Sequence, residues 1–374
     1  MRDLLASLVA VPTENPPGRA YPACLDVLTA ALDACGFAVE RVAIPTPAGA
    51  PATALFASYG DPGPTLYFHG HYDVVPAMSS GQFTPRVEGD TLFGRGSSDM
   101  KSGLVAMLYA AKALRDEGVR LGGRIGLLFV PDEETGGALG SGALAASGWL
   151  ARDAIGMLLP EPTTGVVWNA NRGALTLEVV VNGRAAHVGL MHLGVNAFER
   201  AVTVVNRLLA LERDLNARGS LLLIGGRVEA GSNFNVVPES CRFTVDRRMN
   251  PDEDFETERR RLLALFDQAR ADGVDLEVRT LQDGRAAATP AATPLGEALA
   301  GAIAAVTGEP ATFEMCPGLL EIRFYAERGV PAFAYGPGIL AVSHGPQEFV
   351  RISRMVECAK VYAFAALGLL GDGR

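Results

Sequence analysis

One stretch constrains the fold of this chain more than any other: the run Thr65-Leu-Tyr-Phe-His-Gly-His-Tyr-Asp-Val-Val75. Its apolar, strand-forming first half ends abruptly in His71 and Asp73. Side chains two residues apart on an extended backbone point to the same side, so this imidazole and this carboxylate would be displayed together. Open α/β sheets bind their ligands at the carboxyl ends of buried strands. The stretch therefore predicts a buried strand and a candidate metal site, although a strand end with solvated polar residues explains it equally well.

Strand and helix patterns alternate around this stretch. Apolar strands are predicted over 53–59, 125–130 and 155–159, and short helical patterns include one over 140–150. A longer helix is predicted over 101–117, where apolar residues recur with helical spacing. This alternation indicates an α/β domain with a largely parallel sheet.

The pattern changes near Gly173. Leu175–Val181 alternates between apolar and polar residues and ends at Asn182-Gly183, a pair typical of a β-hairpin turn. Further along the chain, strand patterns and two helical patterns alternate. They predict an antiparallel sheet with helices on one face, which makes residues 173–285 a second, α+β domain.

The second domain is predicted to be inserted in the first. Residues 286–294, rich in alanine, threonine and proline, form a candidate linker back to the α/β domain. That domain would then comprise residues 1–172 and 286–374. A chain of 374 residues is long enough for two domains.

Composition and charge exclude several classes of protein. A chain with 48% apolar and 20% charged residues is expected to fold, and its formal net charge of −9 argues against nucleic acid or an anionic membrane as a partner. No apolar run is long enough to span a bilayer, and the N-terminal residues do not resemble a secretory signal. Five scattered cysteines without Cys-x-x-Cys spacing predict reduced thiols in a cytoplasmic protein and no zinc-thiolate site.

Four further positions supply candidate metal ligands. Asp99 precedes the predicted helix over 101–117, and taken alone it is more commonly explained as the N-cap of that helix. Glu134 lies in an acidic run after a predicted strand, where adjacent charges repel one another unless a cation offsets them; a solvated turn is the alternative. Glu161 follows another predicted strand and lies between two prolines, and His344 follows a glycine-rich loop.

Together with His71, these residues form a set of imidazole and carboxylate ligands. Mixed nitrogen and oxygen ligation suits Zn²⁺, with Co²⁺ or Mn²⁺ as alternatives. Two cations about 3.5–4 Å apart can share a water molecule, lower its pKa and polarise a carbonyl group. We therefore expect two divalent metal ions as cofactors.

Six motifs in order along the chain resemble those of the M20 metallopeptidase family, and within it the acetylornithine deacetylase and succinyl-diaminopimelate desuccinylase group. They are His69-Gly-His-Tyr-Asp73, Gly96-Ser-Ser-Asp-Met-Lys101, Asp132-Glu-Glu-Thr-Gly136, Pro160-Glu-Pro-Thr163, Ala186-His-Val-Gly189 and Ser343-His-Gly-Pro346. The resemblance runs from about Leu8 to Val356. One such motif would be weak, but six in order are specific.

The resemblance implies a phosphorylase/hydrolase-like zinc-exopeptidase catalytic domain with an inserted ferredoxin-like lid that also dimerises. Its metal ligands would be His71, Asp99 and Glu161 for one ion, and Asp99, Glu134 and His344 for the other, with Asp99 bridging the two ions. Asp73 would orient His71.

The resemblance also implies roles for four other residues. Glu133 would be the general base that takes a proton from the attacking water and passes it to the leaving amine. His187, from the lid, would stabilise the oxyanion, in some members across the dimer. Asn235 and Arg248 would bind the substrate carboxylate, although an ion pair with Asp246 or Glu239 explains Arg248 equally well, and a turn explains Asn235.

The chain departs from the family pattern at Cys316-Pro-Gly-Leu-Leu-Glu-Ile-Arg323, where many members carry a Gly-Thr/Ser-Asp stretch near the acyl pocket. Two leucines and Glu321 replace smaller residues, so we expect a bulkier, more apolar pocket wall. Arg323 would read a substrate carboxylate or pair with Glu321.

The function predicted from these features is a metal-dependent amidohydrolase that removes an N-acyl group, such as acetyl or succinyl, from an amino acid. A dipeptidase or carboxypeptidase of the same family is the alternative, since it would use the same metals. The substrate would accordingly be a small N-acyl amino acid or a dipeptide. A non-catalytic binding protein on this fold is the alternative from another class, but no ligand of the pattern is missing. A serine hydrolase is disfavoured because the chain has no Gly-x-Ser-x-Gly motif.

Overall fold

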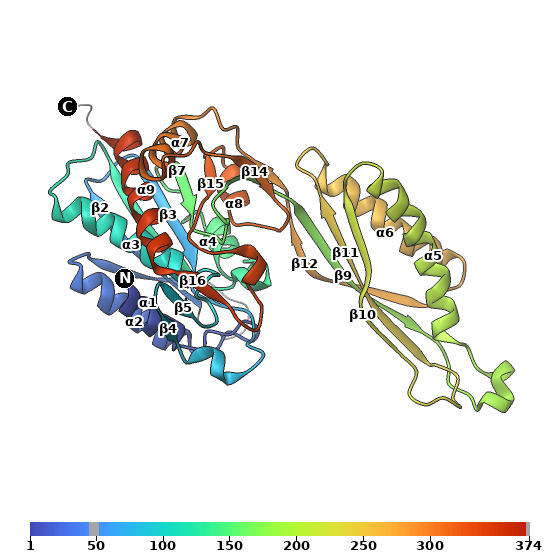
Figure 1. Ribbon diagram of the computed structural model, residues 1–374. Helices are drawn as coiled ribbons and strands as arrows, with labels where there is room; N and C mark the ends of the chain where they lie inside the picture. The colour runs from blue at the N-terminus through green and yellow to red at the C-terminus, as the bar shows by residue number, and fades with distance from the viewer. Residues whose placement is uncertain (45–51, 372–374) are drawn as a thin grey trace. The chain divides into compact units, whose positions relative to one another are not determined.

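The computed structural model describes residues 1–44 and 52–371, which form two compact units (Figure 1). The first unit comprises Met1–Ala170, Ala288–Cys316 and Glu321–Arg374, and the second comprises Asn171–Ala287 and Pro317–Leu320. The second unit is therefore inserted between segments of the first, and the short segment Pro317–Leu320 returns to it.

A nine-stranded sheet is the centre of the first unit. Its order is β1 (Val39–Ile44), β2 (Ala52–Gly60), β6 (Arg124–Val130), β3 (Thr65–His71), β7 (Ala154–Leu159), β15 (Ala332–Ala334), β8 (Val167–Asn171) and β13 (Ala287–Ala288), with β14 (Phe313–Cys316) paired to β8. The four strands β6, β3, β7 and β15 run parallel to one another.

Outside these four strands the sheet is mixed, which corrects the prediction of a largely parallel sheet. Strand β2 is antiparallel to both of its neighbours, β1 and β6, and β15 is antiparallel to β8. Only residues 45–51 separate β1 from β2. That is too short for the crossover of a dozen or more residues that a parallel pair needs, so β2 reverses direction.

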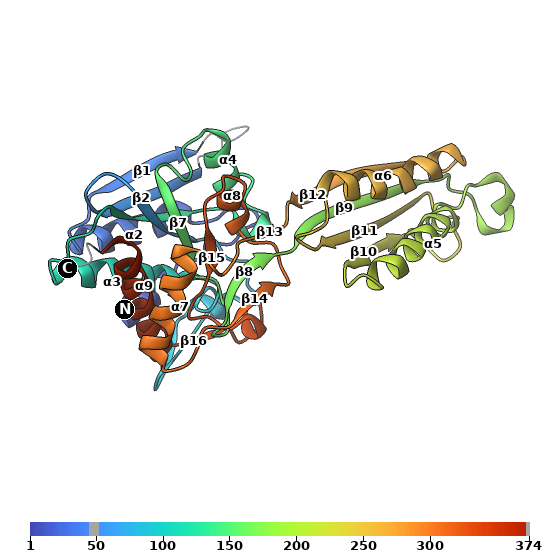
Figure 2. The same ribbon diagram turned by 90° about the horizontal axis from the view of Figure 1, so that it is seen from above.

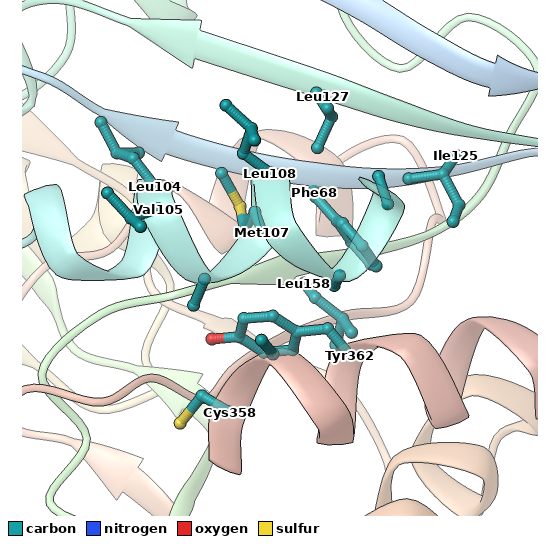
Figure 3. Packing of buried hydrophobic residues seen from close by; sticks show 14 of the residues in the cluster. Phe68, Leu104, Val105, Met107, Leu108, Ile125, Leu127, Leu158, Cys358 and Tyr362 are labelled. Carbon is teal, nitrogen blue, oxygen red and sulfur yellow. The ribbon is translucent and has the colours of Figure 1, made fainter. Parts of the chain in front are cut away.

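Helices α1 (Arg2–Val9), α2 (Tyr21–Ala34), α3 (Lys101–Asp116), α7 (Pro294–Thr307) and α9 (Ile352–Leu370) contribute to the main core of this unit. Figure 3 shows α3 and α9 against the sheet, where Phe68 of β3 lies between their side chains. The rings of Phe68 and Tyr362 are 5.6 Å apart. Fully burying one such side chain stabilises a fold by about 1.5–3 kcal/mol, so these contacts fix the sheet that carries the candidate ligands.

Two shorter helices, α4 (Ser141–Ala146) and α8 (Ile322–Ala326), contact each other. The helix predicted over 140–150 is thus confirmed in position but ends early. Its last residue is Ala146, Ser147 is the C-cap, and Gly148 follows with φ of 71°, a left-handed conformation that ends a helix.

A small three-stranded sheet brings two distant loops together. It consists of β16 (Phe349–Arg351), β5 (Thr91–Phe93) and β4 (Arg86–Glu88), with Phe349 opposite Phe93. The residues just after β5 therefore lie beside the residues just before β16. These two loops carry Asp99 and His344.

The second unit is a four-stranded antiparallel sheet with two helices (Figure 2). The strand order is β10 (Leu221–Ala230), β11 (Ser240–Met249), β9 (Gly173–Asn182) and β12 (Leu276–Gly284), and α5 (Ala197–Asn216) and α6 (Phe255–Ala271) pack on it through one core. The chain order β-α-β-β-α-β is that of a ferredoxin-like fold, so the predicted α+β fold is confirmed.

The hairpin predicted at Asn182-Gly183 is wrong. Strand β9 pairs with β11 and β12, neither of which follows it directly. Gly183 does not have the positive φ that a type I′ turn requires. A glycine is needed at this position because the backbone of Val195 passes close by. A Cβ atom on residue 183 would lie 2.3 Å from the carbonyl oxygen of Val195.

None of the helices in the described part of the chain combines the length and hydropathy needed to cross a bilayer.

Candidate metal centre

The candidate ligands of the first unit lie at one edge of the central sheet. His71 is the last residue of β3, Glu134 follows β6, Glu161 follows β7, and His344 comes after β15. Because these four strands are parallel, their carboxyl ends meet at the same edge. The structure therefore brings together side chains that are far apart in the sequence.

Asp99 lies between the two histidines of this group. Its Oδ1 is 3.4 Å from Nε2 of His71, and its Oδ2 is 3.3 Å from Nε2 of His344. Each oxygen of one carboxylate thus faces a different imidazole. A carboxylate in this arrangement can contribute one oxygen to each of two cations.

His71 is completely buried and oriented by the chain that follows it. Its Nδ1 is 3.0 Å from the backbone carbonyl of Asp73, so Nδ1 carries a proton whether the ring is neutral or charged, and Nε2 is the nitrogen that a metal would take. Nε2 is 3.8 Å from both Glu133 and Glu161 and has no hydrogen-bond partner in the described structure. A buried imidazole nitrogen that lies among carboxylates and has no hydrogen-bond partner there is suited to bind a metal ion.

His344 and Glu134 complete the second half of the group. Nε2 of His344 lies 3.2 Å from Oε2 of Glu134, while the other oxygen of Glu134 accepts a hydrogen bond from the backbone N–H of Val75. The His344 side chain is 52% exposed, whereas the carboxylates beneath it are almost fully buried. His344 therefore lies at the solvent side of the group.

The candidate ligands concentrate negative charge in a buried place, and a pair of cations would offset it. Burial raises the pKa of Glu161 well above its usual value, and the charge of Asp99 adds to this effect. Burial likewise raises the pKa of Glu133, with His71 opposing and Glu134 reinforcing the shift. Oε1 of Glu161 is also buried without a hydrogen-bond partner among the described residues. Four carboxylates, two imidazoles and two unpartnered ligand atoms fit a site for divalent metal ions.

Hydrogen bonds that the His344 ring donates to Asp99 and Glu134 raise the pKa of His344 to about 11 when no metal is present. For His71, burial lowers the pKa, but hydrogen bonds to Asp73 and Asp99 outweigh it and the net shift is upward. Protons on the two imidazoles thus partly balance the carboxylates. A metal ion would replace these protons.

Asp73 has a wider role than the predicted orientation of His71. Its Oδ1 lies 3.4 Å from Nδ1 of His71. Its carboxylate also accepts hydrogen bonds from the backbone N–H groups of Glu133 and Glu134, at 3.3 and 3.2 Å. One buried carboxylate thus positions the end of β3 and the acidic turn after β6.

Asn15 belongs to the site but gave no recognisable signal in the sequence. Its Nδ2 lies 2.9 Å from Oδ2 of Asp73, 3.2 Å from Asp132 and 3.0 Å from Thr135. In the sequence, Asn15 is simply part of a proline-rich turn. Its contacts depend on residues 58 to 120 positions away.

The three adjacent acidic residues after β6 are separated by the backbone. Asp132 has a left-handed φ of 75°, and its carboxylate accepts hydrogen bonds from Thr135 and from the N–H of Leu139. Glu133 and Glu134 instead begin the short 3₁₀ turn η2 (Glu133–Thr135) and enter the ligand group. Only two of the three carboxylates therefore share the site.

Two glycines of the loop after β15 allow the close approach of the neighbouring ligand loops. A Cβ on Gly336 would lie 2.3 Å from the carbonyl oxygen of Glu161, and one on Gly338 would lie 2.2 Å from that of Ser98. Larger residues would push the Glu161 and Asp99 backbones away.

Glu321, from the predicted pocket wall, lies inside the first unit. Glu321 is fully buried, and its Oε2 lies 2.8 Å from Nε2 of His69, whose Nδ1 lies 3.0 Å from the hydroxyl of Tyr325. Glu321 is therefore an internal partner of His69. Arg323 is buried as well and donates a hydrogen bond to the carbonyl of Gly136.

The remaining predicted site residues, His187, Asn235 and Arg248, belong to the second unit. His187 and Asn235 lie on adjacent segments, because Val188 donates a backbone hydrogen bond to Asn235 and His187 bridges to Val236. The imidazole of His187 is exposed, and its Nδ1 accepts a hydrogen bond from the N–H of Gly189 at 3.1 Å. In the neutral ring this leaves Nε2–H as a donor.

Arg248 makes an ion pair within the second unit. Its guanidinium contacts both oxygens of Asp246, at 2.7 and 3.0 Å. This is one of the two interpretations that the sequence allowed. The pair with Asp246 uses Nε and Nη2 of the guanidinium. Substrate binding by Arg248 stays a prediction.

The family model of peptidase family M20/M25/M40 matches residues 67–367. The chain belongs to this family. This confirms the predicted family, and it makes the chain a metal-dependent hydrolase of amide bonds with candidate ligands in place.

Similar proteins cover almost the whole chain. A succinyl-diaminopimelate desuccinylase from Methylobacterium radiotolerans is 29% identical over 375 residues, 96% of this chain and 94% of that protein. Two solved structures share the fold over 98% of this chain. The M20 family metallo-carboxypeptidase Sso-CP2 from Sulfolobus solfataricus has a TM-score of 0.81, 18% identity and 98% of its own chain covered. The dipeptidase Dug1p from Saccharomyces cerevisiae has a TM-score of 0.79, 15% identity and 95% covered.

Proposed function

We propose that this protein removes an N-acyl group, such as acetyl or succinyl, from an amino acid or a related amine, using two divalent metal ions. The position of Asp99 between His71 and His344 carries the proposal, because one carboxylate with an imidazole at each oxygen suits a bridge between two cations. The desuccinylase relative supports an acyl-amino-acid substrate over a longer peptide.

The proposed ligands are His71, Asp99 and Glu161 for one ion, and Asp99, Glu134 and His344 for the other. Zn²⁺ suits this mixture of nitrogen and oxygen ligands, and Co²⁺ or Mn²⁺ would also be accommodated. Bound cations would polarise the amide carbonyl and lower the pKa of the attacking water.

Glu133 is the proposed general base. Its carboxylate lies 3.8 Å from His71, and burial holds its pKa well above the usual value, which makes it a stronger base than an ordinary carboxylate. A base with a pKa near the working pH takes a proton from water and returns it to the leaving amine most efficiently. Asp73 accepts a hydrogen bond from the backbone N–H of Glu133 and so fixes the position of the Glu133 backbone from which this side chain extends.

Residues of the second unit would act on the substrate. His187 presents Nε2–H as a donor for the developing oxyanion. Asn235, next to it, and Arg248 are the proposed partners of the substrate carboxylate.

The second unit is also the proposed dimer contact. Strand β10 is an edge strand, and its side chains of Leu221, Leu223 and Val228 are exposed. An apolar edge strand favours pairing with another copy of the chain. Leu223→Glu should therefore yield a monomer in light scattering after size-exclusion chromatography, and a wild-type protein that is monomeric at micromolar concentration would exclude the dimer.

A release assay tests the proposed function. N-acetyl, N-succinyl, N-formyl and N-aromatic-acyl amino acids and a set of dipeptides are compared, with metal-free and metal-loaded protein. We expect metal-dependent release of an amino acid from one N-acyl class. Faster cleavage of dipeptides would identify a dipeptidase, and full activity in metal-free protein would refute the metal-dependent mechanism.

A further inference from the structure

Glu348 is a buried carboxylate that holds the loop carrying Asp99. One of its oxygens, Oε1, accepts hydrogen bonds from three backbone N–H groups: those of Gly96, Ser98 and Asp99, at 2.9–3.0 Å. The side chain is completely buried. A single oxygen atom thus sets the curvature of the loop and the position of the Asp99 backbone.

The other oxygen of Glu348 leads to His344. Oε2 accepts a hydrogen bond from Nη1 of Arg95 at 2.6 Å, and Nη2 of the same guanidinium donates to the backbone carbonyl of His344 at 3.1 Å. Arg95 is buried as well. The two nitrogens of one planar guanidinium therefore connect Glu348 with the chain of the second histidine.

The two loops are joined at other points too. The N–H of Gly94 donates to the carbonyl of Glu348, and Ser98 exchanges hydrogen bonds with the backbone of Ile339 through its hydroxyl. The side chain of Glu348 contacts the Asp99 loop directly and reaches His344 through Arg95.

Stability alone is a weak explanation for this arrangement. Burying an ion pair costs desolvation energy that its attraction often does not exceed, and apolar residues of similar volume can replace such pairs without loss of stability. Apolar residues, however, could not accept hydrogen bonds from three N–H groups and a guanidinium and so hold them at fixed positions. Those positions determine where Asp99 and His344 stand before any metal arrives.

We propose that Glu348, with Arg95, is a positioning residue that preorganises the two-metal site by fixing Asp99 relative to His344. The inference rests on the proposed function, because it concerns the same ligands. Glu348 itself touches no candidate ligand side chain in the described structure; it acts through the backbone of Asp99 and through Arg95.

Glu348→Gln tests this role. A glutamine of the same shape has one oxygen and one NH₂ group, so it must turn its NH₂ either toward the three N–H groups or toward Arg95, and both choices place donor against donor. We expect Zn²⁺ affinity, measured by competition with a chelating dye, to fall about 10- to 100-fold, as for other residues that orient metal ligands. Circular dichroism of the metal-free variant should match that of the wild type.

Glu357→Gln is the matched control. Glu357 also pairs with an arginine, Arg354, but on the partly exposed surface of α9. We expect its Zn²⁺ affinity to equal that of the wild type. Equal affinity in Glu348→Gln as well would overturn the proposal, while fewer than two metals per wild-type chain would instead refute the two-metal function.

Arg95→Lys keeps the test decisive if Glu348→Gln does not fold. A lysine retains the positive charge next to Glu348 but cannot reach both Glu348 and the His344 carbonyl in one plane. We expect one of the two metals to bind more weakly, by about tenfold or more, while the other retains its affinity. Two unchanged metal affinities in this variant would overturn the proposal.

Discussion

Oδ2 of Asp99 lies 3.3 Å from Nε2 of His344, although 245 positions, the difference 344 − 99, separate the two residues in the chain. Because the other oxygen of Asp99 faces His71, this contact makes Asp99 the residue shared by both halves of the site.

Asp99→Asn is expected to abolish two-metal binding. A neutral amide offers one oxygen and an NH₂ group, so it cannot give an oxygen to each of two cations. Metal content measured by mass spectrometry should fall from two per chain to one or fewer, and kcat/KM should fall by at least about 100-fold, the upper range for residues that only orient ligands. Asp267→Asn, on the exposed surface of α6, is the control that should keep both metals.

Glu133→Gln should separate catalysis from metal binding. If Glu133 is the base, the variant retains two metals and kcat falls about 10²- to 10⁴-fold, because proton transfer is lost. Glu134→Gln should instead lose metal as well as activity. Since Glu133 lies within ligand distance of His71, loss of a metal from Glu133→Gln would identify it as a ligand and contradict its role as base.

His187→Ala should lower kcat about 10²- to 10³-fold without changing metal content, as expected for the loss of one oxyanion donor. His192→Ala, five residues along the same loop, is the control and should behave like the wild type. Unchanged kcat in His187→Ala would refute the donor role.

Mixing two inactive variants tests whether His187 acts across a dimer. Glu133→Ala and His187→Ala subunits should regain part of the activity when combined, because some mixed dimers would contain one site with both residues. No recovery, once subunit exchange has been shown with labelled chains, would place His187 in its own subunit's site.

Metal binding should release protons. Both histidines have pKa values raised above the ordinary 6.5, that of His344 to about 11, so they are protonated near pH 7 when no metal is present. A metal requires the neutral imidazole. Titration of metal-free protein with Zn²⁺ at pH 7 in two buffers of different ionisation enthalpy should therefore give more than one proton released per chain, and His344→Asn should release fewer.

The stability of the metal-free protein should follow the same shifts. A histidine whose pKa is raised by folding stabilises the protein below its unfolded pKa, and this contribution is lost as the pH rises through the folded value. Raised carboxyl pKa values, such as those of Glu133 and Glu161, act in the same direction. We expect the Tm of metal-free protein to fall between pH 6 and 9 and that of metal-loaded protein to change less; a metal-free Tm that rises over this range would contradict the assignment.

His69→Ala should destabilise the fold without removing a ligand. It leaves the buried carboxylate of Glu321 without its imidazole partner, and breaking one half of a buried pair costs about 3–5 kcal/mol. Denaturant unfolding measures this cost. The double variant His69→Ala/Glu321→Leu should recover part of the stability, because no charge is then left unpaired; a double variant less stable than the single one would argue against the pair.

Much of the fold could be predicted because it depends on local patterns. Apolar runs marked β3, β6 and β7, and the polar residues at their ends marked the candidate ligands. The antiparallel position of β2 and the close packing at Gly183 depend on which strand lies next to which, and residue periodicity carries no such information. Glu348 and Asn15 were missed for the same reason, because their partners are brought close only by folding.

The sequence by itself determined the kinds of candidate ligand and their places at strand ends or in loops, because side-chain chemistry and hydrophobic periodicity are local properties. Only the tertiary structure decided which of them meet. It placed Asp99 between His71 and His344, paired His69 with Glu321, and connected Glu348 to both ligand loops. The physical reason is that a contact between distant residues depends on strand order and on the paths of loops, which the packing of the whole chain fixes.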